Sequence, residues 1–86
     1  MPEICRFYGI IIYIFYQEHN PPHFHAVYGE HETLITINDL AVFSGYLPGR
    51  ALGLVIEWAS LHKEELKKDW DKAVNHEKLE KIEPLK

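Results

Sequence analysis

An unbroken apolar run, Ile10–Tyr16, constrains this chain more than any other feature, because every residue in it is β-branched or aromatic. Such residues favour a strand over a helix. The run is seven residues long, whereas a membrane-spanning helix needs ~20, so it predicts a strand of a globular core with a bulge or bend at Gly9. Since polar residues do not alternate with apolar ones, we expect both faces of this strand to be covered.

Turn-forming residues divide the rest of the first half into short segments. Pro21 and Pro22 remove two backbone donors, so residues 17–22 cannot continue a ladder. Gly29 and Glu30 indicate a turn. We therefore expect an antiparallel β-meander of three to four strands. The strands predicted after the apolar run cover about 23–28, 33–37 and 41–43.

The second half of the chain has a helical period. Its stripe recurs at spacings of three and four residues: Ala51, Leu52, Val55, Trp58, Ala59, His62, Leu66, Trp70 and Val74. A single helix over 48–75 would be about 42 Å long, which is long for so small a domain. The pattern therefore allows one long helix or two shorter ones with a break near 60–63. In the tail, Ile82 and Leu85 are expected to fold back onto the sheet.

These elements predict one α+β domain over residues 1–86, with a meander in 1–45 and a helical half and tail in 46–86. One helical layer leaves a face of the first strand bare, which predicts a homo-oligomer or a complex with another protein. The interface is expected on the opposite face of that strand or on the face that carries Ile10, Ile12, Ile14 and Tyr16.

Charge is distributed unevenly along the chain. Residues 1–45 hold one cation, Arg6, and five acidic residues, whereas residues 46–86 hold eight of each sign. Non-specific nucleic-acid binding depends on Lys and Arg, so direct contact with nucleic acid is not expected. A single cysteine, Cys5, excludes an internal disulfide. With no signal-peptide pattern and no membrane span, we expect a cytoplasmic protein.

Histidines are the strongest candidates for chemistry. Four of the six lie within thirteen residues: His19, His23, His25 and His31. His23 and His25 share a face of their predicted strand because side chains alternate with period two. They can chelate zinc or another divalent transition metal if His19, His31, Glu18 or Glu30 completes the site. One alternative is that both histidines are exposed and form hydrogen bonds with the backbone or with a partner chain. The other is acid–base catalysis without a metal.

Other residues allow two interpretations each. His62 is either a core-edge histidine bonded to a loop carbonyl or a ligand or base brought to the paired histidines, and Glu18 is the other candidate base. Arg50 either binds an anion or pairs with a carboxylate. Trp58 and Trp70 are expected to anchor the core, and the alternative is an exposed aromatic hot spot for a partner. Cys5 is expected to be buried and inert.

Two segments resemble a known bacterial family. They are Pro2–Ile10 and the run Asn20-Pro21-Pro22-His23-Phe24-His25-Ala26. The chain is similar there to the family called domain of unknown function 4160. Matches to its helical half include Arg50-Ala51-Leu52, Glu57-Trp58, Leu61-His62 and Trp70, and the tail matches at 81–85. One departure is Asp69, where the family more often has asparagine.

The resemblance implies no established activity. Genes of the family often lie beside a small protein of the domain of unknown function 2442 type, in arrangements that resemble toxin–antitoxin pairs. We therefore expect a protein–protein interaction component of such a two-gene pair. The alternative is a small metal-dependent hydrolase or nuclease that uses the His-x-His strand. The lack of a complete catalytic signature favours the first interpretation, and the sequence does not decide which member is the toxin.

Overall fold

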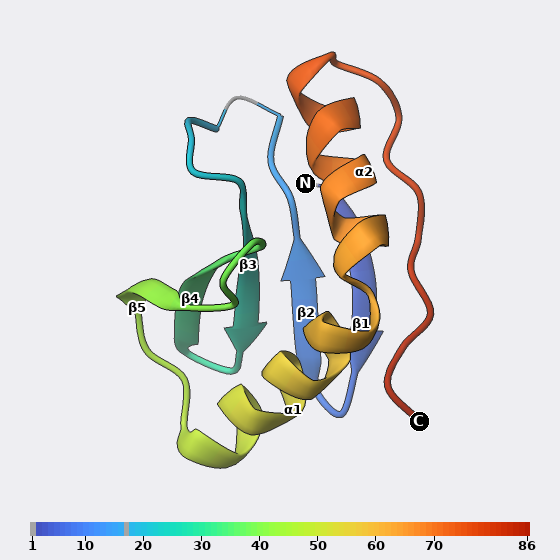
Figure 1. Cartoon of the computed structure of the whole chain (residues 1–86). Coiled ribbons are helices and arrows are strands. Elements are labelled where there is room, and N and C mark those ends of the chain that lie inside the picture. The colour runs from blue at the N-terminus through green and yellow to red at the C-terminus, as the bar shows by residue number, and fades with distance from the viewer. Residues whose placement is uncertain (1, 17) are drawn as a thin grey trace.

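The computed structural model describes residues 2–16 and 18–86, so Met1 and Gln17 lie outside it. The chain forms a five-stranded antiparallel sheet followed by two helices, which confirms the predicted α+β class (Figure 1). The strands lie in the sheet in the order in which they occur in the chain, as in a meander. The elements are β1 Glu3–Phe7, β2 Ile10–Tyr13, β3 His23–Tyr28, β4 His31–Thr36, β5 Val42–Gly45, α1 Gly49–Leu61 and α2 Lys63–Val74.

β1 raises the strand count above the three to four that were expected. It pairs with β2 in an antiparallel hairpin, in which Phe7 faces Ile10 across a two-residue turn. Both turn residues have positive φ, 49° at Tyr8 and 80° at Gly9. Such turns match the twist of paired strands. Gly9 therefore belongs to a hairpin turn rather than to a bulge or bend at the start of a strand.

The two faces of β2 are covered differently, which corrects the expectation that both would be buried. Ile10, Ile12 and Ile14 have no exposed surface and lie in the core that the sheet forms with the helices. These isoleucines cannot form the predicted interface. The remaining alternative is an interface on the opposite face of the strand. This is the outer face of the sheet, which is turned away from the helices. Three residues of the β2 segment are only partly buried there: Ile11, Tyr13 and Phe15.

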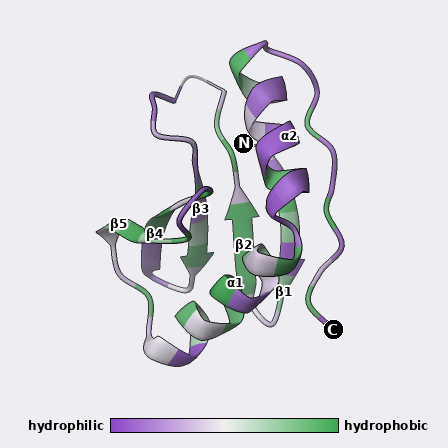
Figure 2. Cartoon of the chain, viewed as in Figure 1, coloured by the Kyte–Doolittle hydropathy of each residue, from purple (hydrophilic) through white to green (hydrophobic). Residues whose placement is uncertain are grey.

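The helices begin and end close to the predicted break. α1 ends at Leu61, His62 separates the helices, and α2 begins at Lys63. Trp58 of α1 is fully buried, and its ring centroid lies 5.4 Å from that of Phe7. Hydrophobic colour marks β2 and much of α1, whereas α2 is mostly hydrophilic (Figure 2). No helix in the described part of the chain is long and apolar enough to cross a membrane.

The C-terminal tail runs back beside β1. The Ile82 amide donates a hydrogen bond to the Ile4 carbonyl (2.9 Å), and the Ile82 side chain is buried. Trp58 donates its indole N–H to the Glu83 carbonyl (2.8 Å). The Glu80 amide donates to Oδ1 of Asp69 (3.0 Å). These bonds fix the tail between the first strand and the helices.

Candidate metal centre

His23 and His25 are buried on the outer face of β3. Their neighbours Phe24 and Ala26 point to the opposite face, where both are fully buried in the helix-covered core. His23 is 4% exposed and His25 is 8% exposed. Two polar rings are thus almost as inaccessible as the apolar residues between them. Buried polar groups need partners, so the contacts of the two rings decide what the pair can do.

Glu18 meets both rings. It lies in the loop between β2 and β3, which turns at the prolines and returns the chain to the start of β3. Its Oε1 atom lies 2.5 Å from Nε2 of His25 and 3.4 Å from Nε2 of His23. One possible ligand atom from each of the three residues lies within 4.8 Å of the other two. The loop and the strand therefore aim two ring nitrogens and one carboxylate at a common point.

The other ring nitrogens are fixed by acceptors. Nδ1 of His23 lies 2.8 Å from the carbonyl oxygen of Pro21. A carbonyl only accepts, so this nitrogen carries the proton and donates. Nδ1 of His25 likewise donates to the Glu32 carboxylate at 2.9 Å. With Nδ1 bonded to these acceptors, each ring turns its Nε2 atom toward Glu18. Histidines that bind metals are typically held in this way, with the second nitrogen bonded to a carbonyl or carboxylate.

A proton on His25 would complete the hydrogen bonds of that ring but not those of His23. If His25 is protonated, it donates to Glu18 and to Glu32, and its bonds are complete. Nε2 of His23 is still buried without a hydrogen-bond partner. A divalent cation between the three residues satisfies both nitrogens and the carboxylate together. Ligand distances of about 2.1 Å would require the three residues to adjust around the ion, and the Glu18 side chain, 26% exposed, is the least buried of them.

The electrostatics of Glu18 agree with a cation-binding role. Burial raises the pKa of this carboxyl, but the hydrogen bond and charge of His25, together with those of His23, lower it below its ordinary value. Glu18 is therefore ionised at neutral pH. Divalent transition metals bind ionised carboxylates, so Glu18 is in the form that a metal ligand needs.

Aromatic side chains surround the two histidines. The Phe15 ring lies edge-on to His25, with centroids 4.4 Å apart. His23, at the start of β3, lies 5.1 Å from Phe43 of β5 and 5.3 Å from Trp70 of α2, so α2 also covers this end of the histidine pair. These rings limit the access of water and lower the local dielectric constant. Both effects strengthen electrostatic interactions at the cluster.

The other predicted ligands lie apart from the cluster. His19 is exposed in the β2–β3 loop, and Glu30 is exposed in the turn after β3. His31 begins β4 at the far end of that strand pair, and its ring packs against Tyr46. Among the described residues, the three-member group of possible ligands is Glu18, His23 and His25.

His62 is not part of this group. Its Nδ1 atom lies 2.6 Å from the Glu65 carboxylate, and its ring packs on Trp58. It is therefore a partly buried histidine at the helix break whose hydrogen-bond partner is a carboxylate, not the loop carbonyl that was considered. Among the described residues, no hydrogen bond or ring contact joins His62 to the histidine pair.

Glu32 is the residue that sequence reasoning missed. It lies on β4 directly across from Val27 and reaches the His25 ring diagonally. Nothing in the local sequence indicates this contact, because it depends on the register between β3 and β4. The pairing of strands separated by a Gly29 turn is the one signal that could have suggested it.

Two further predictions concern single residues elsewhere. Cys5 is buried, and burial raises the pKa of its thiol to about 11, so it is unreactive as expected. Arg50 is exposed and forms no ion pair with any described residue. The expected carboxylate partner of Arg50 is therefore absent from the described residues.

The fold and the cluster define a small α+β protein with a buried two-histidine, one-carboxylate group on the outer face of its sheet. A family model, the domain of unknown function 4160, matches residues 9–71, and the chain belongs to this family. The match contains the Asn20–Ala26 run but not β1 or the tail. No curated protein and no solved structure matches the chain.

Proposed function

We propose that this protein binds a divalent transition metal through His23, His25 and Glu18 and uses it in hydrolysis. The observation that carries the proposal is the orientation of the two rings. The Nδ1 atom of each ring donates a hydrogen bond, His23 to the Pro21 carbonyl and His25 to the Glu32 carboxylate. The Nε2 atoms of both rings therefore face the same oxygen of Glu18. Three protein ligands leave coordination positions open, which is typical of catalytic rather than structural sites. A metal in such a site activates bound water and polarises carbonyl or phosphoryl oxygens.

The residues of the chain have distinct tasks in this proposal. His23 and His25 supply nitrogen ligands, and Glu18 supplies the charge that partly neutralises the ion. Pro21 and Glu32 orient the rings from behind. The sequence allows Glu18 to act as a ligand or as a base, and its position between the two rings favours the ligand. The few cations in residues 1–45 disfavour a long nucleic-acid substrate, so small ester or phosphoester substrates are favoured.

Metal binding is tested by equilibrium dialysis of tag-free protein against Zn²⁺, Mn²⁺, Ni²⁺ and Co²⁺, with elemental analysis and thermal melts. We expect about one ion per chain, and a gain of about 2.7 kcal/mol at a hundred times the Kd. The variant His23→Gln/His25→Gln should lose both. The matched control is His19→Gln/His31→Gln, which removes the same number of histidines from exposed positions.

Equal metal binding by both double variants would contradict the site. Hydrolysis is tested separately with p-nitrophenyl acetate, p-nitrophenyl phosphate and bis(p-nitrophenyl) phosphate. Metal-dependent turnover that the cluster variant lacks would support the enzymatic role. Binding without turnover on this panel would leave a metal-binding protein and remove the hydrolase assignment for these substrate classes.

A second function is supported by the outer face of the sheet. Besides the β2 residues already described, Val27 and Leu34 are partly buried on this face, and the rings of Tyr13 and Phe15 stack 5.8 Å apart. An apolar face without a helical layer fits a protein–protein interface. This supports the expected interaction component of a two-gene, toxin–antitoxin-like pair, with a small protein of the domain of unknown function 2442 type or a second copy as partner.

Co-expression with a small protein of the domain of unknown function 2442 type tests this second proposal. A stable complex that Tyr13→Lys disrupts would support it, and the control Lys63→Glu, on the helix side, should leave the complex intact. Size-exclusion chromatography with light scattering on the isolated chain tests the homo-oligomer. A chain that stays monomeric and does not bind its neighbour would overturn both forms of the interaction.

A further inference from the structure

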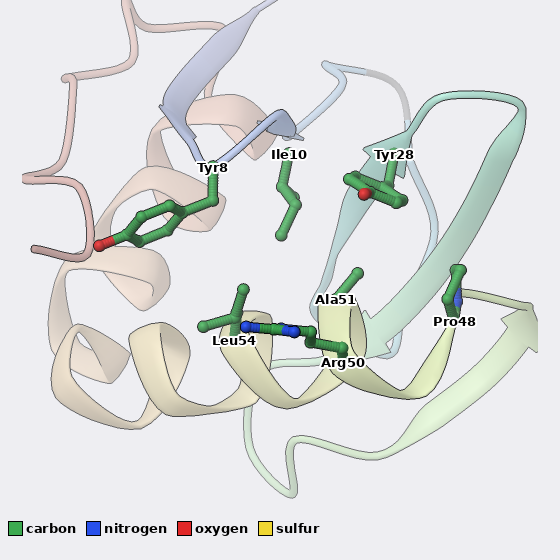
Figure 3. Close-up of a pocket in the computed structure, with 7 residues that line it drawn as sticks. All are labelled: Tyr8, Ile10, Tyr28, Pro48, Arg50, Ala51 and Leu54. Carbon is green, nitrogen blue, oxygen red and sulfur yellow. The ribbon is translucent and has the colours of Figure 1, made fainter.

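A pocket of about 450 Å³ lies at the end of the molecule opposite to the histidine cluster. It is formed where the β1–β2 turn and the end of β3 meet the first turns of α1 (Figure 3). β3 connects the two sites, with His23 at its first position and Tyr28 at its last. Tyr28 also belongs to the helix-facing side of the strand, whereas the histidines belong to the outer side. The pocket is therefore a separate site.

The floor of the pocket is apolar and its rim is polar. Figure 3 shows Tyr8 and Tyr28 on either side of Ile10, facing Arg50, Ala51 and Leu54 of α1 across the pocket. The Tyr28 ring lies across the β1–β2 turn, since a methyl group at Gly9 would sit 3.5 Å from it. A pocket of this size with an apolar floor and a few convergent polar groups is typical of small-molecule sites.

The polar groups on this rim have no partners within the described chain. Arg50 forms no ion pair there, and neither tyrosine hydroxyl forms a hydrogen bond with another described residue. Arg50 is also the one Lys or Arg between residues 7 and 62. A chain with thirteen acidic residues thus leaves this guanidinium unpaired beside an apolar pocket. Such a group favours an anion that the protein does not itself supply.

We propose that this pocket binds a small aromatic monocarboxylate. A guanidinium forms two parallel hydrogen bonds to a carboxylate, and Arg50 can offer both. The flat part of the ligand would lie between the two tyrosine rings over Ile10, where stacking and burial contribute. Arg50 is the one cation among the residues that line the pocket, and the chain as a whole has a net charge of −4, so one negative charge on the ligand is favoured over the two of a phosphate monoester.

The proposal is tested by titrating ¹⁵N-labelled protein with 2-naphthoate, 2-naphthamide and 2-naphthyl phosphate. EDTA is present throughout, so the carboxylate has no metal ion to coordinate. We expect 2-naphthoate to shift the amides of the β1–β2 turn, the end of β3 and the first turns of α1. We also expect its Kd to be at least fivefold lower than those of the other two compounds.

Two variants separate the pocket from the charge of the whole molecule. Arg50→Gln should weaken 2-naphthoate binding by tenfold or more and leave 2-naphthamide unchanged. Arg6→Gln removes the same charge from an exposed pair with Glu3 and should leave both unchanged. The proposal is overturned if 2-naphthoate causes no shifts at about 10 mM, if the amide or the phosphate binds as well, or if the two variants behave alike. Spectra of the free variants establish that each is folded.

Discussion

The two faces of β3 are almost equally inaccessible, but they are stabilised in different ways. On the helix side, Phe24 and Ala26 pack into a continuous apolar core. On the outer side, His23 and His25 are covered by aromatic rings, and their polar atoms depend on Glu18, Glu32 and a backbone carbonyl. Phe24 and Ala26 carry no polar side-chain atoms, so this face of β3 leaves no side-chain donor or acceptor to satisfy. The histidine side is left with an unpaired nitrogen, which is the expected mark of a site built for a ligand rather than for stability.

The largest effect is expected on the helix side. Trp58→Ala removes a fully buried ring that contacts Phe7 and Phe24 and bonds the tail. We expect a loss of about 3–5 kcal/mol in the free energy of unfolding, measured by urea denaturation. Tyr13→Ala on the outer face is the matched aromatic change and should cost about 1 kcal/mol. Equal losses would show that the outer face is as much a part of the core as the helix side.

The next effect concerns the support of the histidines from behind. Glu32→Gln keeps the size of the side chain but removes the charge that accepts from Nδ1 of His25. Changes of this kind lower metal affinity by about 10-fold or more, which we expect for Zn²⁺ in competition with a chelator of known affinity. Glu30→Gln, in the exposed turn, is the control. Unchanged affinity in Glu32→Gln would remove this residue from the site.

A third change probes a buried polar atom on the helix side. Oδ2 of Asp69 is buried without a partner, and burial raises the pKa of this carboxyl. A raised carboxyl pKa favours the folded state below the unfolded pKa of about 3.9, and this contribution is lost as the pH rises through the folded value. Asp69→Asn should therefore stabilise the protein at pH 7 by on the order of 1 kcal/mol.

The same pH dependence supplies the control for Asp69→Asn. Its advantage over the natural chain should shrink as the pH is lowered toward 4, because protonation of Asp69 progressively removes the buried charge. Urea denaturation at several pH values measures this difference. An advantage that is constant with pH would show that the carboxyl titrates normally in the folded protein.

The smallest change in the free energy of unfolding is expected at His23, where the effect on metal binding should be largest. His23→Leu replaces a ring with an unpaired nitrogen by an apolar side chain beside Phe43 and Trp70. Such replacements are nearly neutral or stabilising, so we expect a change within about 1 kcal/mol without metal. Metal binding should nevertheless be lost. A large loss of stability in metal-free protein would mean that His23 is a structural residue.

Features of the fold that depend on neighbouring residues in the sequence could be predicted, whereas features that depend on contacts between distant residues could not. β3 was predicted to its end residues because prolines precede it and Gly29 ends it, and both signals are local. β1 was missed because Glu3 and Arg6 interrupt its apolar pattern, although they pair with each other on the surface. The helix break was expected from length alone, and the structure places it at His62.

The site was predictable to the same degree. A His-x-His pattern on a strand places two rings on one face, so His23 and His25 could be paired from sequence. The third member was one of four candidates, and only the path of the β2–β3 loop selects Glu18. Glu32 and the pocket beside Arg50 depend on strand register and on how α1 crosses the sheet, and neither has a local signal.

The C-terminal tail covers one of the two edges of the sheet, the edge formed by β1. Because residues around Ile82 occupy the free edge next to Ile4, that edge has no room for another strand. The opposite edge is β5, a short strand with a bulge in its ladder and with Val42 and Phe43 exposed. Unpaired edges are where strands from other chains add. Any extension of this sheet, by a second copy or by a foreign peptide, is thus directed to the β5 side alone.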